Sequence, residues 1–123
     1  MNKKNLTTKK TFDLAVQNHK KNNLQAAEKL YKEILKTNPN FAGAYNNLGN
    51  VLHELGKHQK AISCYEKATQ IQPNYANAHY NLGSILHELG KFQKAISCYE
   101  KTIQIQPNYL NAHYNLGLVF KEL

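Results

Sequence analysis

Residues 42–75 read AGAYNNLGNVLHELGKHQKAISCYEKATQIQPNY, and residues 76–109 read ANAHYNLGSILHELGKFQKAISCYEKTIQIQPNY. The two stretches are identical at 26 of 34 positions. Residues 110–123 restart the pattern and match residues 76–89 at 9 positions, while residues 8–41 are a more divergent copy. A fixed period of this length indicates a repeat architecture, in which each unit buries its apolar face against its neighbours.

Each period contains two amphipathic helical patterns. Leu48, Leu52 and Leu55 follow the i, i+4, i+7 spacing of one helix face. A second pattern carries Ala61 and ends before Pro73, which cannot extend a helix. We therefore predict an all-α protein with helices at about 8–21, 25–37, 42–55, 59–71, 76–89, 93–105 and 110–123.

The residues between the helices predict how the helices end. Gly56 and Gly90 follow the first helix of their units, where a left-handed residue is favoured, and Asn22 takes the same place earlier in the chain. Asn74 follows Pro73 and is expected to help cap the next helix.

Glycine also recurs inside the first helix of each unit, as Gly49, Gly83 and Gly117, with Ala15 in the first copy. Glycine inside a helix costs roughly 1 kcal/mol relative to alanine. We expect that close approach of the paired helix explains this recurring cost.

Composition limits the class of protein. The chain has 123 residues, 41% of them hydrophobic, and no apolar run approaches the ~18–20 residues of a membrane span. The basic start lacks the apolar stretch of a secretory signal, so we expect a cytoplasmic protein. Cys64 and Cys98 lie one period apart, too far for an intrachain disulfide, and are expected to be unreactive packing residues.

The net charge of +8 is concentrated at the N-terminus. All 16 basic residues are lysines, and nine lie in residues 1–36, which contain three acids. Nucleic-acid binders generally use arginine and aromatic residues as well. The composition therefore favours a solvated lysine face over nucleic-acid binding.

The motif resembles the tetratricopeptide repeat family over residues 8–123. The residues that carry the resemblance are Asn47, Leu48, Gly49, Gly56, Ala61, Tyr65, Ala68 and Pro73. The resemblance implies a right-handed superhelical solenoid of antiparallel helix pairs, whose first helices line a concave groove. The expected segments are a basic tail (1–7), three repeats (8–41, 42–75 and 76–109) and the first helix of a fourth (110–123).

The resemblance also places a binding surface. Asn47, Asn81 and Asn115 recur one residue before a leucine, on the groove wall, as in the asparagine ladder of O-linked N-acetylglucosamine transferases. An amide can donate to and accept from a peptide backbone. The predicted groove residues are Asn47, Asn81, Asn115, Asn46, Tyr80, Tyr114, Asn50, His53 and His87.

The polar residues give no sign of catalysis or of a cofactor. His19, His53 and His87 are repeat equivalents, too far apart for one metal ion, and a helix C-terminus favours a nearby histidine. Glu54 and Glu88 repeat beside them, whereas a catalytic pair needs two different environments. We therefore predict no catalytic residue, no metal and no cofactor.

The resulting interpretation is a scaffold that binds an extended peptide or a partner helix. A chaperone-tail clamp is rejected, because the family's clamp pattern needs other residues at Phe12, Val16, Asn77 and Asn81, and only Asn47 matches it. Two alternatives remain: the repeat region of a larger glycosyltransferase or sulfotransferase, and weak nucleic-acid binding through the lysine-rich start.

The last helical pattern has no second helix to cover it. Leu116, Gly117 and Phe120 should lie partly open, with Leu118, Val119 and Leu123 adding apolar surface. We expect the array to continue, or to self-associate through this helix.

Overall fold

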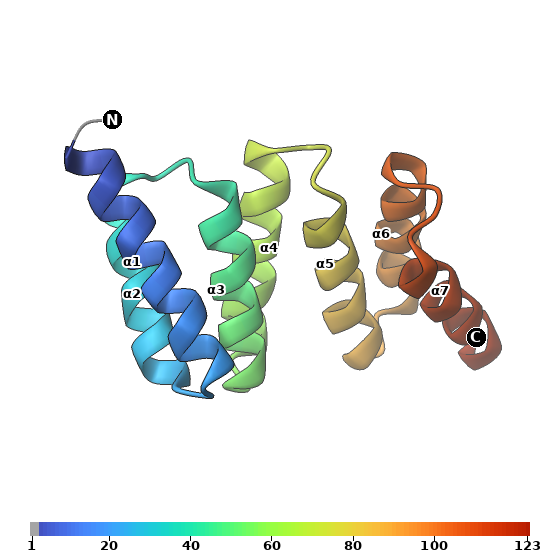
Figure 1. The fold of residues 1–123 in the computed structure, drawn as a ribbon. Coiled ribbons are helices and arrows are strands. Elements are labelled where there is room, and N and C mark those ends of the chain that lie inside the picture. The colour runs from blue at the N-terminus through green and yellow to red at the C-terminus, as the bar shows by residue number, and fades with distance from the viewer. Residues whose placement is uncertain (1–2) are drawn as a thin grey trace. The chain divides into compact units, whose positions relative to one another are not determined.

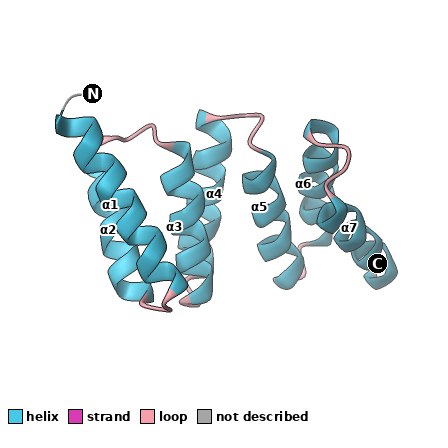
Figure 2. Cartoon of the chain, viewed as in Figure 1, coloured by secondary structure: helices cyan, strands magenta, loops and turns pink. Residues whose placement is uncertain are grey.

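The computed structural model describes residues 3–123, with side chains from residue 7 onward, and this part of the chain consists of helices joined by short loops, without strands (Figures 1 and 2). The helices are α1 (Lys3–Lys20), α2 (Leu24–Thr37), α3 (Ala42–Glu54), α4 (His58–Ile71), α5 (Ala76–Glu88), α6 (Phe92–Ile105) and α7 (Leu110–Glu122). We call α1, α3, α5 and α7 the first helices, and α2, α4 and α6 the second helices.

The helix ends lie within one residue of the prediction, except at the start of α1. This helix begins at Lys3, five residues earlier than expected, so the prediction of a tail was wrong for residues 3–7. The physical reason is that residues 3–20 contain neither proline nor glycine to interrupt the helix. Residues 1–2 of the predicted tail lie outside the described residues. The repeat boundaries stay a prediction.

The chain divides into two compact units, which are described separately. Unit 1 comprises residues 1–64 and unit 2 comprises residues 65–123, so the division falls within α4. In unit 1, α1 and α2 form an antiparallel pair and α3 packs on α2. In unit 2, α5 and α6 form the equivalent pair, and α7 packs on α6 and contacts α5.

The core of unit 1 is built around a tyrosine of its second helix. Tyr31 is fully buried, together with Ala15 and Ala27. The edge of the Phe12 ring meets Tyr31 at a centroid distance of 5.8 Å, and the same ring stacks on Phe41 at 5.1 Å. Burying a large ring beside small alanines lets α1 and α2 approach closely.

Unit 2 has the same arrangement, and there it explains an interior glycine. A Cβ atom on Gly83 would lie 2.9 Å from two ring carbons of Tyr99, which is fully buried, and 3.1 Å from Cβ of Cys98. The expected close approach is therefore confirmed at Gly83. At Gly117 it stays a prediction, because no second helix follows α7 in this sequence and a Cβ atom there would meet nothing within 4 Å.

The predicted left-handed residues are confirmed. Asn22, Gly56 and Gly90 have φ angles of 64°, 78° and 77°. After Gly56 the chain turns so that the Lys57 backbone N–H donates to the Leu52 carbonyl at 2.8 Å, which satisfies a helix-end acceptor.

The expected cap at Asn74 was wrong. The residue preceding α5 is Tyr75, and no side-chain hydrogen bond caps this helix. Its start is instead held by a backbone turn in which the Tyr75 N–H donates to the Gln72 carbonyl at 3.1 Å.

Helix α7 exposes part of the apolar surface that the sequence predicted. Leu110, Phe120 and Leu123 are 78%, 54% and 60% exposed. Val119, in contrast, is fully buried, so its assignment to the open surface was wrong. The contact of α7 with both α5 and α6 covers this face of the helix.

Two substitutions in unit 2 test the close contact at Gly83. Gly83→Ala should lower the free energy of unfolding, because overpacking against the buried Tyr99 ring costs about 1–3 kcal/mol while helix propensity returns about 1 kcal/mol. The matched control Gly117→Ala should raise it by up to about 1 kcal/mol, since the space is open. Urea denaturation followed by circular dichroism measures both. Equal effects of the two substitutions would contradict this account.

Candidate binding surface of the first helices

The asparagine of the predicted ladder in unit 1 is anchored by a tyrosine. Asn47 lies half-buried on α3, and its Nδ2 donates to the hydroxyl of Tyr31 at 3.3 Å. Burial raises the pKa of Tyr31, and the bond from Asn47 opposes that effect. The bond uses one of the two N–H groups of the amide, so the other N–H and the carbonyl oxygen are left for a ligand.

Asn115 of unit 2 is held in a similar way, and its bond joins two first helices. Its Nδ2 donates to the hydroxyl of Tyr80 at 2.8 Å, which ties α7 to α5. Tyr99 on α6 is the repeat equivalent of Tyr31. Burial raises the pKa of Tyr99, and the hydrogen bond that Tyr99 donates to Ser84 opposes this effect. The structure therefore brings the predicted residues Tyr80 and Asn115 into direct contact.

The other predicted groove residues differ in their exposure. Asn50 and His53 on α3 and Asn81 on α5 are half-buried, whereas Tyr114 on α7 is 68% exposed. Asn46 is only 5% exposed, so the structure places it in the core and its assignment to the groove was wrong.

The helix register alone does not explain the Asn46 error, because its repeat equivalents Tyr80 and Tyr114 are half-buried and exposed. The surroundings of Asn46 therefore decide its burial. The half-buried Asn47 is the one that keeps part of its surface in water.

A second tyrosine of unit 2 lies beside Tyr80 and was not predicted from the sequence. Tyr109 immediately precedes α7, and its ring centroid lies 5.0 Å from that of Tyr80. Its hydroxyl donates to Oδ1 of Asn77 on α5 at 2.7 Å. Burial and the neighbouring Tyr80 raise its pKa. Next to it is a depression of about 480 Å³, lined by Asn77, Gln106, Asn108, Tyr109, Leu110 and Asn111.

Two histidines in the last turns of first helices contact glutamates. Nε2 of His19 pairs with Glu54, and in unit 2 Nε2 of His87 pairs with Glu122 at 3.2 Å. Both bonds join the ends of successive first helices. The ring of His53 lies at 5.5 Å from that of His58, edge to face. The absence of a metal or cofactor site stays a prediction.

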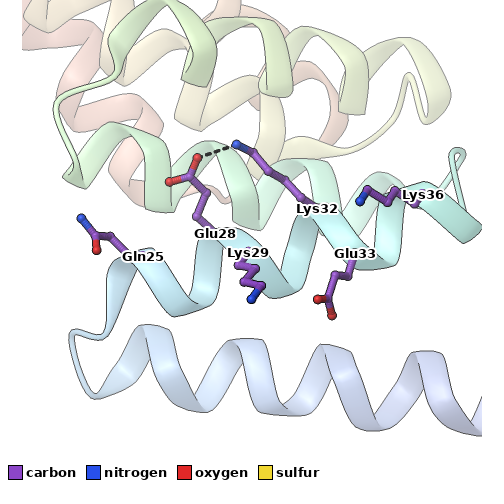
Figure 3. Close-up of a pocket in the computed structure, with 6 residues that line it drawn as sticks. All are labelled: Gln25, Glu28, Lys29, Lys32, Glu33 and Lys36. Carbon is purple, nitrogen blue, oxygen red and sulfur yellow. Dashed lines mark hydrogen bonds and ion pairs between the residues drawn. The ribbon is translucent and has the colours of Figure 1, made fainter.

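The surface of α2 carries a charged depression of about 330 Å³ (Figure 3). Glu28 is buried there and accepts hydrogen bonds from Nζ of Lys32 at 2.7 Å and of Lys57 at 3.2 Å. The bond from Lys32 is the main cause of the lowered pKa of Glu28, and Lys57 adds to it against the opposing effect of burial. The full lining is Gln25, Glu28, Lys29, Lys32, Glu33 and Lys36.

Sequence reasoning missed Glu28, although the repeat contained a signal. Ile62 and Ile96 occupy the equivalent positions one and two periods later. An acid at a position that elsewhere holds a buried isoleucine must find cations, and Lys57 reaches it from the loop before α4. Glu28 therefore ties the second helix α2 to the next helix pair.

The geometry of these helices can be compared with known proteins. A family model described as tetratricopeptide repeat matches residues 40–108, which is more than half of the chain. The chain belongs to the tetratricopeptide repeat family. Among curated proteins, none matches the chain in sequence at a significant level. No helix in the described residues is long and apolar enough to cross a membrane.

Solved structures of other proteins share the fold. MamA is 28% identical with a TM-score of 0.89, and the match covers 94% of this chain and 67% of MamA. An O-GlcNAc transferase mutant of Thermobaculum terrenum is 24% identical with a TM-score of 0.89, and the match covers 97% of this chain and 23% of the transferase.

A third structure contains a bound peptide. The first repeat domain of Spaghetti (RPAP3), bound to the HSP90 peptide SRMEEVD, is 19% identical with a TM-score of 0.90. That match covers 94% of this chain and 91% of that domain.

The thiols fit the expectation of unreactive packing residues in a repeat. Burial raises the pKa of Cys64 and of Cys98 to about 11. The thiolate is the nucleophilic form, so little of either side chain is reactive at neutral pH.

Glu28 gives a testable pH dependence. Its pKa is lower in the folded chain, so its stabilising contribution is present above the ordinary value of 4.5 and is lost as the pH falls through the folded pKa. Glu28→Gln should lower the free energy of unfolding by about 1 kcal/mol at pH ~7, because both lysines are partly exposed. The difference from the natural chain should shrink at pH ~3.

A second substitution serves as the control for Glu28. Glu28→Ile copies Ile62 and Ile96 and should keep or raise stability, since apolar replacement of a buried ion pair is often neutral or favourable. Urea titrations at the two pH values measure both variants. An isoleucine variant less stable than the glutamine variant would overturn this account.

Proposed function

We propose that this tetratricopeptide repeat chain is a non-catalytic scaffold whose first helices bind an extended peptide or a partner helix. The observation that carries the proposal is the anchored asparagine, seen at Asn47 and again at Asn115. A tyrosine hydroxyl takes one N–H of each amide and limits its rotation. A pre-oriented amide loses less conformational entropy when it binds a peptide backbone.

The structural relatives support protein binding in general terms. The Spaghetti (RPAP3) domain is described as bound to a peptide of HSP90, and it shares the fold of this chain. Phe12, Val16 and Asn77 depart from the clamp that grips chaperone tails, so we propose a different ligand here.

A second candidate is that the chain acts as the repeat region of a larger enzyme. The observation in its favour is the likeness to an O-GlcNAc transferase, of which this chain matches only 23%. In that case the same groove would select protein substrates for a catalytic domain elsewhere. Both candidates place the binding role on the first helices.

Replacing the ladder asparagines tests the binding role. The triple variant Asn47→Ala, Asn81→Ala, Asn115→Ala should bind a partner captured from native cells more weakly, because each net hydrogen bond contributes about 0.5–1.5 kcal/mol. Calorimetric titration measures the affinity, which we expect to be on the order of micromolar for the natural chain.

The matched control replaces Asn40 and Asn74, exposed loop asparagines at equivalent repeat positions, by alanine. It should leave the affinity unchanged. Circular dichroism at the titration temperature shows whether each variant is folded. If the folded triple variant binds as tightly as the natural chain, the ladder has no binding role.

Helix α7 leads to a separate proposal of self-association. Leu110, Phe120 and Leu123 are more than half exposed, and burying each such side chain gains about 1.5–3 kcal/mol. Sedimentation velocity over a concentration series should show reversible dimers, and Phe120→Asp should abolish them. A chain that stays monomeric at the highest concentration would disprove this proposal.

A further inference from the structure

Each unit has a pair of aromatic rings in contact. One ring lies on a first helix, and the other lies in the loop that leads to the next first helix. In unit 1 the pair is Phe12 and Phe41, stacked at 5.1 Å with an interplanar angle of 11°. In unit 2 the equivalent residues are Tyr80 and Tyr109, at 5.0 Å and 31°. The second period has Asn46 in place of the first ring, so the pair is not a constant feature of the repeat, and the pair in unit 2 also carries hydroxyl groups.

These two tyrosines remain partly open. Tyr80 and Tyr109 are half-buried, and we call them the tyrosine platform. Tyr114, on the first turns of α7, is 68% exposed and precedes Asn115, which donates to Tyr80. Aromatic side chains that stay partly exposed offer contact area at a low entropic cost.

The hydrogen bonds around the platform leave mainly donors for a ligand. The Oδ1 acceptor of Asn77 is already used by the Tyr109 hydroxyl, so its NH2 group remains. The Tyr80 hydroxyl accepts from Asn115, so its own proton can be donated elsewhere. A ligand that is rich in acceptors and poor in donors matches this surface.

The surface beside the platform is uncharged. The depression next to Tyr109 is lined by the amides of Asn77, Gln106, Asn108 and Asn111, with Leu110 at its edge. A charged ligand group would lose hydration there without gaining an ion pair. The chemistry therefore favours an uncharged segment over the acidic tails that basic clamps bind.

We propose that the tyrosine platform of unit 2 binds a proline-containing segment of a partner protein in the polyproline II conformation. Such a segment has no internal hydrogen bonds, so its carbonyl groups accept from the ligand-binding surface, and proline itself has no N–H to satisfy. The proline rings of such a segment pack flat on aromatic side chains, and the segment is already ordered before it binds. The inference rests on the proposed function, because it names the kind of peptide that the first helices bind.

The test titrates the whole chain with a blocked oligoproline of about ten residues. Calorimetry gives the affinity, and tyrosine fluorescence gives a second binding signal because the chain has no tryptophan. We expect saturable binding, weakened at least about tenfold by Tyr109→Ala, which corresponds to about 1.4 kcal/mol. Tyr114→Ala should weaken it at least about threefold, and because Tyr114 is exposed this variant should fold normally.

The controls separate the platform from aromatic residues in general. Phe41→Ala removes the equivalent ring of unit 1 and should leave oligoproline binding unchanged. Two peptides of the same length, one of glycine, serine and alanine and one rich in aspartate, should bind more weakly than oligoproline. If either binds as tightly, or if Tyr109→Ala and Tyr114→Ala have no effect, the inference is wrong.

Failure of the polyproline inference and failure of the proposed function would give different results. A captured partner that depends on the asparagine ladder, together with no binding of oligoproline, would overturn the polyproline inference alone. Conversely, binding of oligoproline at the platform with an unaffected asparagine triple variant would support the inference and remove the ladder from the binding site.

Discussion

The buried tyrosine of the second helix is the contact on which both the packing and the binding surface depend. In unit 2 the ring of Tyr99 lies so close to Gly83 that no larger residue fits without movement. In unit 1 the hydroxyl of Tyr31 reaches Asn47. A buried tyrosine needs a partner for its hydroxyl, and the first helix supplies one. The tyrosine that holds two helices together therefore also orients an amide on a first helix.

This coupling makes the surface amides part of the fold. An asparagine bound to a buried hydroxyl cannot turn freely, so Asn47 presents its remaining groups in a defined direction. Asn115 shows the same principle across α5 and α7, where its bond to Tyr80 links two first helices. A ligand that bound at this point would find donors whose positions are set by the core. This rigidity would lower the entropic cost of a specific contact with an extended chain.

The fold was predictable from the sequence where local chemistry decides the structure. The 34-residue period, the leucine spacing and the prolines placed most helix ends, and the left-handed positions of Asn22, Gly56 and Gly90 were recognised from residue type alone. The start of α1 was missed because no residue between Lys3 and Thr8 marks a helix end. Each of these features depends on a few neighbouring residues.

The candidate site was less predictable, because its contacts join residues far apart in the sequence. Asn47 was expected to face a ligand. Its hydrogen bond to Tyr31 was not predicted, because the two residues lie 16 positions apart in the sequence. Asn46 was placed on the same surface, although the structure buries it, whereas its repeat equivalents Tyr80 and Tyr114 are half-buried and exposed. The recurrence of Tyr31, Tyr65 and Tyr99 was the available signal, since a tyrosine in place of phenylalanine implies a hydrogen-bond partner.

The ion pair between Glu28 and Lys57 has a consequence for how such an array can change length. Lys57 belongs to the period that follows Glu28, and Lys91 stands at the same place one period later. A gene that lost residues 42–75 would bring Lys91 to the position now held by Lys57. Because Glu28 would meet the same ammonium group, whole periods can be lost or gained beside it without a compensating mutation at this acid.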